Sequence, residues 1–328
     1  MRVVFMGTPE FAVPALQVLI NYSGIEVVGV VTQPDRPVGR KRLLTPTPVK
    51  AEAQKHDIPV LQPEKLRRPE SVEELQALHP DLIVTAAYGQ ILPKSVLAIP
   101  KLGCINIHAS LLPRYRGGAP IHHAVMNGDT VTGVTIMYMA EGLDTGDMIS
   151  SVELPIEDID TTGSMFKKLS AAGAQLLLDT LPDLLVGHVQ AVAQNHEIAV
   201  YSPNISREQE LINWSQSAIS IWNQVRGLNP SPGAYTIWNG EVLKIWTCDK
   251  PGQSEGTNVS ANEINGTQVT KAGSYEPGTV VAVSEQGIQV AAGEGVLTIT
   301  ELQPAGKKAM QAAQFVLGGR LEVGTVLG

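Results

Sequence analysis

The chain has 328 residues, which exceeds the usual size of one domain, so we expect two domains and a sizeable hydrophobic core. Its formal net charge of −8 and its pI of about 5.4 exclude a generally basic nucleic-acid-binding protein. Any contact with nucleic acid must therefore be local. The two cysteines, Cys104 and Cys248, lack the spacing of a metal site, so we expect reduced thiols and no bound metal.

The first residues predict a strand, a helix and a second strand. An apolar run at residues 3–6 precedes a turn and apolar residues at helical spacing, with Thr8 as the expected N-cap and Pro9 as the first helical residue. Residues 26–32 predict the second strand, a pattern typical of a Rossmann-like parallel sheet with helices on both faces. Signal-peptide flanks and an apolar run of about 18 residues are missing, so we expect a cytoplasmic protein without a membrane span.

A basic, proline-rich segment follows the second strand. Residues 33–50 contain five basic residues and one acidic residue, a net charge of +4 in an acidic protein. Their length without an obvious pattern predicts either a solvated mobile loop or a flexible arm for a phosphate backbone. The first turn has no G-x-G-x-x-G motif, so we do not expect a dinucleotide-binding protein.

The remaining elements complete this domain and predict a second one. Helices are expected at residues 51–56, 71–78, 120–126 and 162–186, the last kinked or ended by Pro182, and strands at 58–61, 81–87, 133–139 and 148–154 and in a run ending at His108. After two short helices within 208–226, short strands are expected at 234–238, 242–247, 279–284, 288–292 and 296–302, and a disordered insertion at 251–273. We therefore predict an α/β catalytic domain at 1–189, a linker at 190–207 and a small OB-like β-barrel at 208–328.

Asn106 and His108 lie at the end of a predicted strand, two residues apart and hence on the same face. In an α/β sheet, chemistry collects at the carboxyl ends of strands, although a satisfied histidine and a solvated asparagine would give the same pattern. Asp144 follows a later strand, between Gly142 and Gly146, which allow tight turns near a ligand. Together the three residues offer an amide donor, a base and a carboxylate.

A hydrolase triad of Ser110, His108 and Asp144 is the rival chemistry. Ser110 does not lie in a Gly-x-Ser-x-Gly elbow, and Leu-Leu-Pro follows it, so we disfavour this interpretation.

Three motifs around these residues match a known family. The runs Asn106-x-His108, Ser-Leu-Leu-Pro-x-Tyr-Arg-Gly from Ser110, and Leu-Asp-Thr-Gly-Asp from Leu143 are similar to the core of the folate-dependent formyltransferases. That similarity implies the reaction type but not the acceptor. The basic segment at 32–50 and the closing run at 302–308 extend the likeness, so that almost the whole chain resembles the methionyl-tRNA formyltransferases.

The resemblance implies specific roles. The catalytic residues would be Asn106, His108 and Asp144. The folate-binding residues would be Tyr88, Gly89, Gln90, Ile91, Leu92, Ser110, Leu111, Leu112, Pro113, Gly142 and Leu143. The tRNA-binding residues would be Arg36, Arg40, Lys41, Arg42, Lys307 and Lys308, with Arg42 mapped onto the acceptor stem.

The resemblance also implies direct transfer of the formyl group of 10-formyltetrahydrofolate to methionine on initiator methionyl-tRNA, through a tetrahedral intermediate. The enzyme would be a bacterial monomer of the cytoplasm that uses no metal. Three alternatives share parts of this pattern: a formyltransferase for an amino-sugar nucleotide, a hydrolase of formyl-folate, and a tRNA-binding module without activity. The basic segment argues against the first, the start of the chain at the first strand against the second, and the intact three-residue set against the third.

Overall fold

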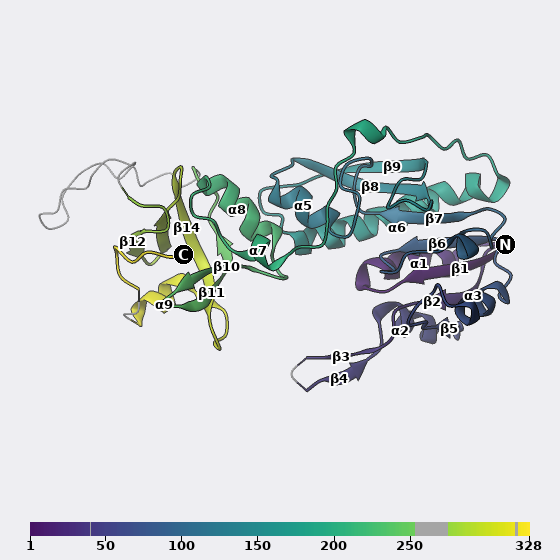
Figure 1. Cartoon of the computed structure of the whole chain (residues 1–328), viewed down its shortest axis with the longest axis horizontal. Helices are drawn as coiled ribbons and strands as arrows, with labels where there is room; N and C mark the ends of the chain where they lie inside the picture. Colours follow the sequence, from purple (N-terminus) through teal and green to yellow (C-terminus); the bar gives the residue numbers. More distant parts are fainter. Residues whose placement is uncertain (40, 253–274, 319–320) are drawn as a thin grey trace, which may run out of the picture. The chain divides into compact units, whose positions relative to one another are not determined.

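The computed structural model describes residues 1–39, 41–252, 275–318 and 321–328. Backbone contacts divide the chain into two compact units. The first comprises residues 1–120, 131–155 and 166–203, and the second comprises residues 121–130, 156–165 and 204–328. Each unit has its own sheet (Figure 1), which confirms the predicted pairing of an α/β domain with a domain of short antiparallel strands. The domain boundaries at 189 and 208 stay a prediction.

The first unit is built on a seven-stranded sheet in the order β5-β2-β1-β6-β7-β8-β9. Its strands are β1 (Arg2–Gly7), β2 (Glu26–Val31), β5 (Val60–Leu61), β6 (Leu82–Ala86), β7 (Cys104–His108), β8 (Val131–Tyr138) and β9 (Met148–Pro155). The first five strands in this order are parallel, as predicted, whereas β8 and β9 run antiparallel to their neighbours. A parallel return needs a crossover that packs on the same sheet, but between β7 and β8 the chain passes through the second unit.

The helices of this unit begin and end close to the predicted positions. They are η1 (Glu10–Ala12), α1 (Val13–Asn21), α2 (Pro48–Lys55), α3 (Pro69–Gln76), α4 (Lys94–Leu97), α6 (Thr162–Val186) and the 3-10 turn η2 (His196–Ile198). The predicted N-cap at Thr8 is wrong, because its hydroxyl donates to the carbonyl of Tyr88 at 2.9 Å and α1 starts after a 3-10 turn. Nor does α6 end at Pro182, which is exposed near the helix end, where one missing backbone hydrogen bond is tolerated.

Helix α6 is by length and composition the one described helix that could cross a membrane. It packs instead against the sheet. Leu169, Leu177 and Leu181 are fully buried, and a Cβ added at Gly173 would lie 2.9 Å from Ile107 Cγ2 in β7. These contacts are those of a core helix.

The basic segment is not the unstructured connection that the sequence predicted. Residues Arg36–Val38 form β3 and Leu43–Thr45 form β4, an antiparallel pair that leads directly into α2. Thr47 caps α2, because its hydroxyl accepts a hydrogen bond from the backbone N–H of Lys50. The hairpin stands out from the rest of its unit (Figure 1).

The second unit contains α7 (Arg207–Glu210), α8 (Ala218–Gly227), α9 (Ala312–Leu317) and most of α5 (Pro120–Met126). Its antiparallel sheet has the order β10-β11-β14-β13-β12, with β15 beside β14. The strands are β10 (Ala234–Trp238), β11 (Glu241–Cys248), β12 (Val280–Ser284), β13 (Gly287–Ala291), β14 (Val296–Pro304) and β15 (Met310–Gln311).

The last residues of the chain join the two ends of this sheet. The N–H of Val280 in β12 donates to Thr325 O, and the N–H of Gly328 donates to Ile237 O in β10. The C-terminal segment thus fills the gap between β12 and β10 and closes the barrel. The predicted disordered insertion at 251–273 lies almost entirely outside the described residues.

Candidate active site

Strand β7 carries Asn106 and His108 on the face of the sheet that α6 does not cover. Successive side chains of a strand alternate between faces, and Ile107 lies against α6. Asn106 and His108 therefore project to the opposite side, and the His108 side chain is buried there. The predicted shared face is confirmed.

The hydrogen bonds of His108 determine which ring nitrogen can exchange a proton. Its Nε2 lies 2.9 Å from the backbone carbonyl of Tyr115, which can only accept, so the neutral ring carries its proton on Nε2. The free lone pair then belongs to Nδ1, which faces Asp144 Oδ2 at 3.7 Å. That distance is too long for a direct hydrogen bond but close enough for the carboxylate to stabilise an imidazolium.

Asp144 reaches this position from a loop that leaves β8 at Tyr138, beside Ile105 of β7. Its backbone has a φ of +49°, and its Oδ2 accepts a hydrogen bond of 2.8 Å from the N–H of Gly117. Gly146 closes the loop so tightly that a Cβ there would overlap the carbonyl oxygen of Tyr138. The loop is therefore folded over the strand and brings its carboxylate to His108.

The side-chain amide of Asn106 is oriented by Thr85 in the neighbouring strand β6. The Thr85 hydroxyl has one proton and faces three acceptors, Asn106 Oδ1 at 2.8 Å, the carbonyl of Ile105 at 3.0 Å and Met139 Sδ at 3.3 Å. The contact to Asn106 is the shortest, and it turns the amide oxygen toward Thr85. The NH₂ group of Asn106 has no protein partner among the described residues. An amide held in this way presents donors to a ligand on the His108 face.

Several of the residues that the resemblance assigned to folate binding make contacts inside the protein instead. Tyr88 packs in the core, where burial raises the pKa of its hydroxyl to about 12. The Gln90 amide bonds to Leu66 N and Pro63 O, and the fully buried Ser110 hydroxyl donates to Arg114 O at 2.6 Å. The partners of Gln90 and Ser110 are typical of side chains that support a loop, whereas the buried Tyr88 hydroxyl has no hydrogen-bond partner among the described residues.

Other residues of the same set present apolar surface. Ile91 is 83% exposed and Leu143 is 56% exposed, on the loops that follow β6 and β8. Leu92 and Leu112 are buried, and Leu111 and Pro113 are half-buried. Large exposed apolar side chains of this kind are suited to contact a planar organic ligand.

The predicted tRNA-binding residues lie in two places. Arg36, Lys41 and Arg42 are exposed on the hairpin, whereas Arg40 lies outside the described residues. Lys307 and Lys308 are exposed in the second unit, in the turn between β14 and β15.

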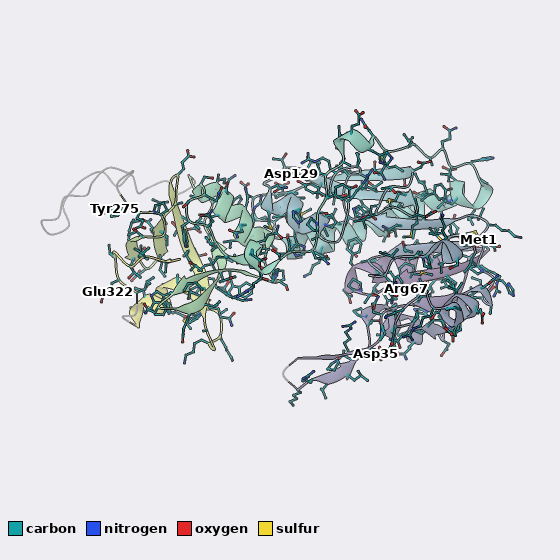
Figure 2. The ribbon with its side chains drawn as sticks, viewed as in Figure 1. Met1, Asp35, Arg67, Asp129, Tyr275 and Glu322 are labelled. Atoms are coloured by element: carbon teal, nitrogen blue, oxygen red, sulfur yellow. The ribbon has the colours of Figure 1, made fainter. Side chains whose placement is uncertain are left out.

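Lys50 has a different role from the other basic residues of the segment. Its Nζ lies 2.6 Å from Asp35 Oδ2 and 2.7 Å from Gln62 Oε1, at the base of the hairpin. The hydrogen bonds from Lys50 and then Gln62 hold the pKa of Asp35 below its usual value. Asp35 is labelled in Figure 2. This pair fixes the hairpin base rather than offering free charge.

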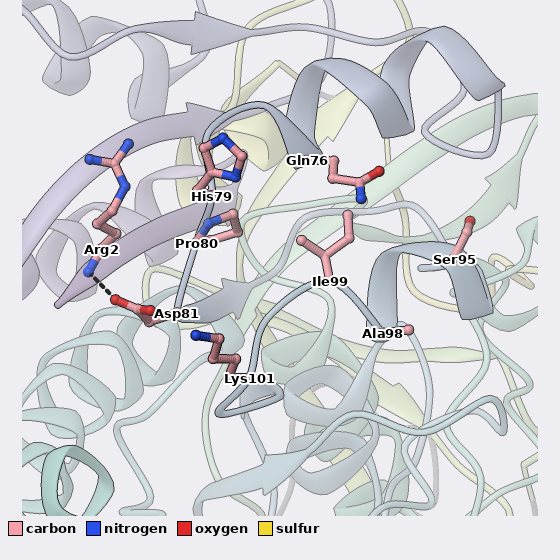
Figure 3. A pocket seen from close by; sticks show the side chains of 9 residues that line it. All are labelled: Arg2, Gln76, His79, Pro80, Asp81, Ser95, Ala98, Ile99 and Lys101. Carbon is pink, nitrogen blue, oxygen red and sulfur yellow. Dashed lines mark hydrogen bonds between the residues drawn. The ribbon is translucent and has the colours of Figure 1, made fainter.

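A separate pocket of about 530 Å³ lies at the amino ends of the parallel strands, where β1 and β6 begin (Figure 3). It is lined by Arg2, His79, Asp81 and Lys101 among others, and the N–H of Arg2 donates to Asp81 Oδ2 at 2.8 Å. None of the predicted site residues lines it.

Within the described residues, no three or more His, Cys, Asp or Glu side chains are grouped so that they could hold a metal.

An amide donor, an imidazole and a carboxylate thus lie together at the carboxyl end of β7. The family model for formyl transferase matches residues 1–181, and that for the formyl transferase C-terminal domain matches residues 204–320. Methionyl-tRNA formyltransferase of Bacillus subtilis (strain 168) is 56% identical over 328 residues, which cover 100% of this chain and 98% of that protein. The chain therefore belongs to the formyl transferase family, in its methionyl-tRNA formyltransferase branch.

Two solved structures share the fold at low identity. The sugar 3N-formyl transferase WlaRD, in the presence of dTDP and 5-N-formyl-THF, has a TM-score of 0.64 at 19% identity, covering 94% of this chain and 99% of that one. HypX from Aquifex aeolicus in complex with tetrahydrofolic acid has a TM-score of 0.60 at 18% identity, covering 98% of this chain and 48% of that one. This chain thus spans about half the length of HypX.

Proposed function

We propose that this protein transfers the formyl group of 10-formyltetrahydrofolate to the α-amino group of methionine on initiator methionyl-tRNA, for translation initiation. The observation that carries the proposal is the unpartnered NH₂ group of Asn106 on the face shared with His108 and Asp144. The 56% identity to a methionyl-tRNA formyltransferase over the full chain supports the choice of acceptor.

Asn106 is the proposed oxyanion donor. When the amine attacks the formyl carbon, the carbonyl oxygen gains charge, and the NH₂ group held by Thr85 donates a hydrogen bond to it. Removing one donor of this kind costs about 2.7–4 kcal/mol of transition-state stabilisation in other enzymes. The donor is pre-oriented before substrate arrives, so little reorganisation is needed.

His108 is the proposed proton carrier, and Nδ1 is the atom that acts. Nε2 is engaged with Tyr115, so the proton that the attacking amine loses moves to Nδ1, directly or through a water. Asp144 at 3.7 Å stabilises the resulting imidazolium. As the bond between the formyl carbon and the folate nitrogen breaks, His108 returns that proton to the leaving nitrogen. No proton is gained or lost overall.

Binding is assigned to the edges of this centre. The folate co-substrate would lie against the exposed side chains of Ile91 and Leu143 and the backbone of the loops that Tyr88, Gln90 and Ser110 support. The exposed basic side chains of the hairpin and of Lys307 and Lys308 would contact tRNA phosphates. We further propose a monomeric cytoplasmic enzyme without a membrane anchor, with a catalytic domain at residues 1–189 and a tRNA-binding β-barrel domain at 208–328.

The experiment is a comparison of acceptors. Formyl transfer from 10-formyltetrahydrofolate is measured with charged initiator methionyl-tRNA, with an amino-sugar nucleotide and with water. Rapid formylation of the tRNA alone is the expected result. Transfer to the sugar, or release of free formate at a comparable rate, would reject the proposed acceptor.

A further inference from the structure

Arg116 is a buried cation close to the catalytic loop. It is 1% exposed, and the described residues place no carboxylate within salt-bridge distance of its guanidinium. Its Nε and one terminal nitrogen donate to Gln194 Oε1 at 3.1 and 2.6 Å, and the same terminal nitrogen lies 3.0 Å from His196 Nδ1. Burying a charge with neutral partners is costly, so the arrangement calls for a reason other than stability.

Gln194 links Arg116 to the loop that carries Asp144. Its Nε2 donates to the backbone carbonyl of Asp144 at 2.9 Å and to that of Gly146 at 2.7 Å. The orientation of the amide is unambiguous, because its oxygen faces only guanidinium donors and its nitrogen faces carbonyl acceptors. Every hydrogen-bonding group of this side chain is thus used.

The side chain of Asp144 is held by the residue next to Arg116. The N–H of Gly117 donates to Asp144 Oδ2, while Arg116 itself forms backbone hydrogen bonds with Val200 and Ser202. A Cβ at Gly117 would lie 2.8 Å from Ser202 O, so this backbone fits tightly against residues 200–202. The same short segment therefore fixes the Asp144 backbone through Gln194 and its carboxylate through Gly117.

We propose that Gln194 and Arg116 are positioning residues for Asp144, an inference that rests on the proposed catalytic role of that carboxylate. Asp144 has a φ of +49°, a conformation that non-glycine residues hold only when their surroundings support it. Gln194 supplies two donors to this strained loop, and Arg116 fixes the amide that supplies them. The pair keeps the carboxylate oxygen 3.7 Å from His108 Nδ1 without touching substrate itself.

The test is Gln194→Glu, which keeps the shape and the contact with Arg116 but places an oxygen acceptor against two carbonyl oxygens. We expect kcat to fall about 10²-fold, as for a displacement of about 1 Å at a catalytic group. The KM values for both substrates should stay within threefold. Gln175→Glu, in the exposed part of α6, is the matched control and should leave kcat unchanged.

A double-mutant cycle with Asp144→Asn separates positioning from general loss of structure. If Gln194 acts through Asp144, the double variant should be no more than about threefold slower than Asp144→Asn alone. Multiplicative losses would overturn the proposal, as would an unchanged kcat in Gln194→Glu. Near-normal activity of Asp144→Asn would instead reject the catalytic role of Asp144.

If Gln194→Glu fails to fold, Arg116→Lys provides the second measurement. It keeps the positive charge but loses the planar guanidinium group, whose two N–H groups donate to the Gln194 amide oxygen. A fall in kcat of about tenfold that disappears in the Asp144→Asn background supports the same conclusion. An equal fall in both backgrounds contradicts it.

Discussion

Two regions of the first unit are built in opposite ways. Among the groups proposed for chemistry, His108 is buried and Asn106 and Asp144 are half-buried, and fixed partners hold them, such as Tyr115 O for the ring and Gly117 N for Asp144. The basic hairpin at 36–45 has exposed side chains throughout strand β4, including Leu43 and Leu44, and is secured mainly at its base.

The difference matches what each task requires. Transition-state stabilisation needs donors and acceptors placed within a fraction of an ångström, which buried hydrogen-bond networks provide. Attraction of a polyanion needs positive charge that water and phosphates can reach, and it tolerates movement. The hairpin meets the rest of the unit where Lys50, Asp35 and Gln62 bond to one another and Gln62 donates to Gln33 O. Substitutions in the two regions should therefore act on different kinetic constants.

Removing the imidazole should have the largest effect. His108→Ala is expected to lower kcat by about 10²–10⁴-fold, the usual range for general acid–base catalysis. Binding of 10-formyltetrahydrofolate, measured by isothermal titration calorimetry, should change little. The exposed His188 offers a matched control, and His188→Ala should behave as the unchanged protein. Near-normal turnover of His108→Ala would remove this residue from the mechanism.

Removing the amide donor should cause the second-largest loss of activity. Asn106→Ala is expected to lower kcat by about 10²–10³-fold with a modest change in KM, because the interaction forms in the transition state. Thr85→Val frees the amide to rotate but leaves it in place, so its loss of kcat should be smaller. If Thr85→Val proved as damaging as Asn106→Ala, Thr85 would act by more than orienting the amide.

Local sequence patterns predicted much of this arrangement. The helix at 120–126 and the strand at 234–238 agree with the structure, because apolar spacing and turn residues near each element determine them. The shared face of Asn106 and His108 follows from the period of a strand. The two short strands of the basic segment were missed, since Pro37 and the surrounding charges argue against a strand and neither three-residue strand is long enough to show alternation.

Long-range contacts could not be predicted in this way. Arg116 and Gln194 are 78 positions apart, and Thr85 meets Asn106 only because β6 and β7 are neighbours in the sheet. Neither Gln194 nor Thr85 belongs to a motif with a recognisable spacing. Similarly, the antiparallel direction of β8 depends on a detour of the chain through the other unit. Such contacts can be identified only from the three-dimensional structure.

Charge removal on the hairpin should affect affinity rather than turnover. Replacing Lys41 and Arg42 by Gln is expected to raise the KM for tRNA about tenfold at moderate salt and to leave kcat within twofold. The slope of log affinity against log salt should become shallower by about 0.7–0.9 for each phosphate that is no longer neutralised. Lys65 and Arg67, exposed elsewhere in the unit, make the control pair. An unchanged slope would leave Lys41 and Arg42 as ordinary surface charge.

The smallest effect should come from the hairpin base. Hydrogen bonds from Lys50 and Gln62 lower the pKa of Asp35 in the folded protein, so its stabilising contribution is complete above the unfolded value of about 3.9. As the pH falls through the lower folded-state pKa, that contribution disappears. Asp35→Asn should therefore lower the free energy of unfolding by about 1 kcal/mol at pH 7, and by progressively less towards pH 3.

Thermal unfolding of the two proteins between pH 7 and pH 3 measures this difference, with Asp57→Asn as an exposed carboxylate control in the same unit. The gap in Tm between the unchanged protein and Asp35→Asn should narrow as Asp35 becomes protonated. A gap independent of pH would mean that shape, and not the charge on Asp35, secures the hairpin. Because Asp35 bonds to Lys50 and Gln62 and to none of the proposed catalytic residues, kcat should be unaffected, and a large fall in kcat would show that the two regions are not separate.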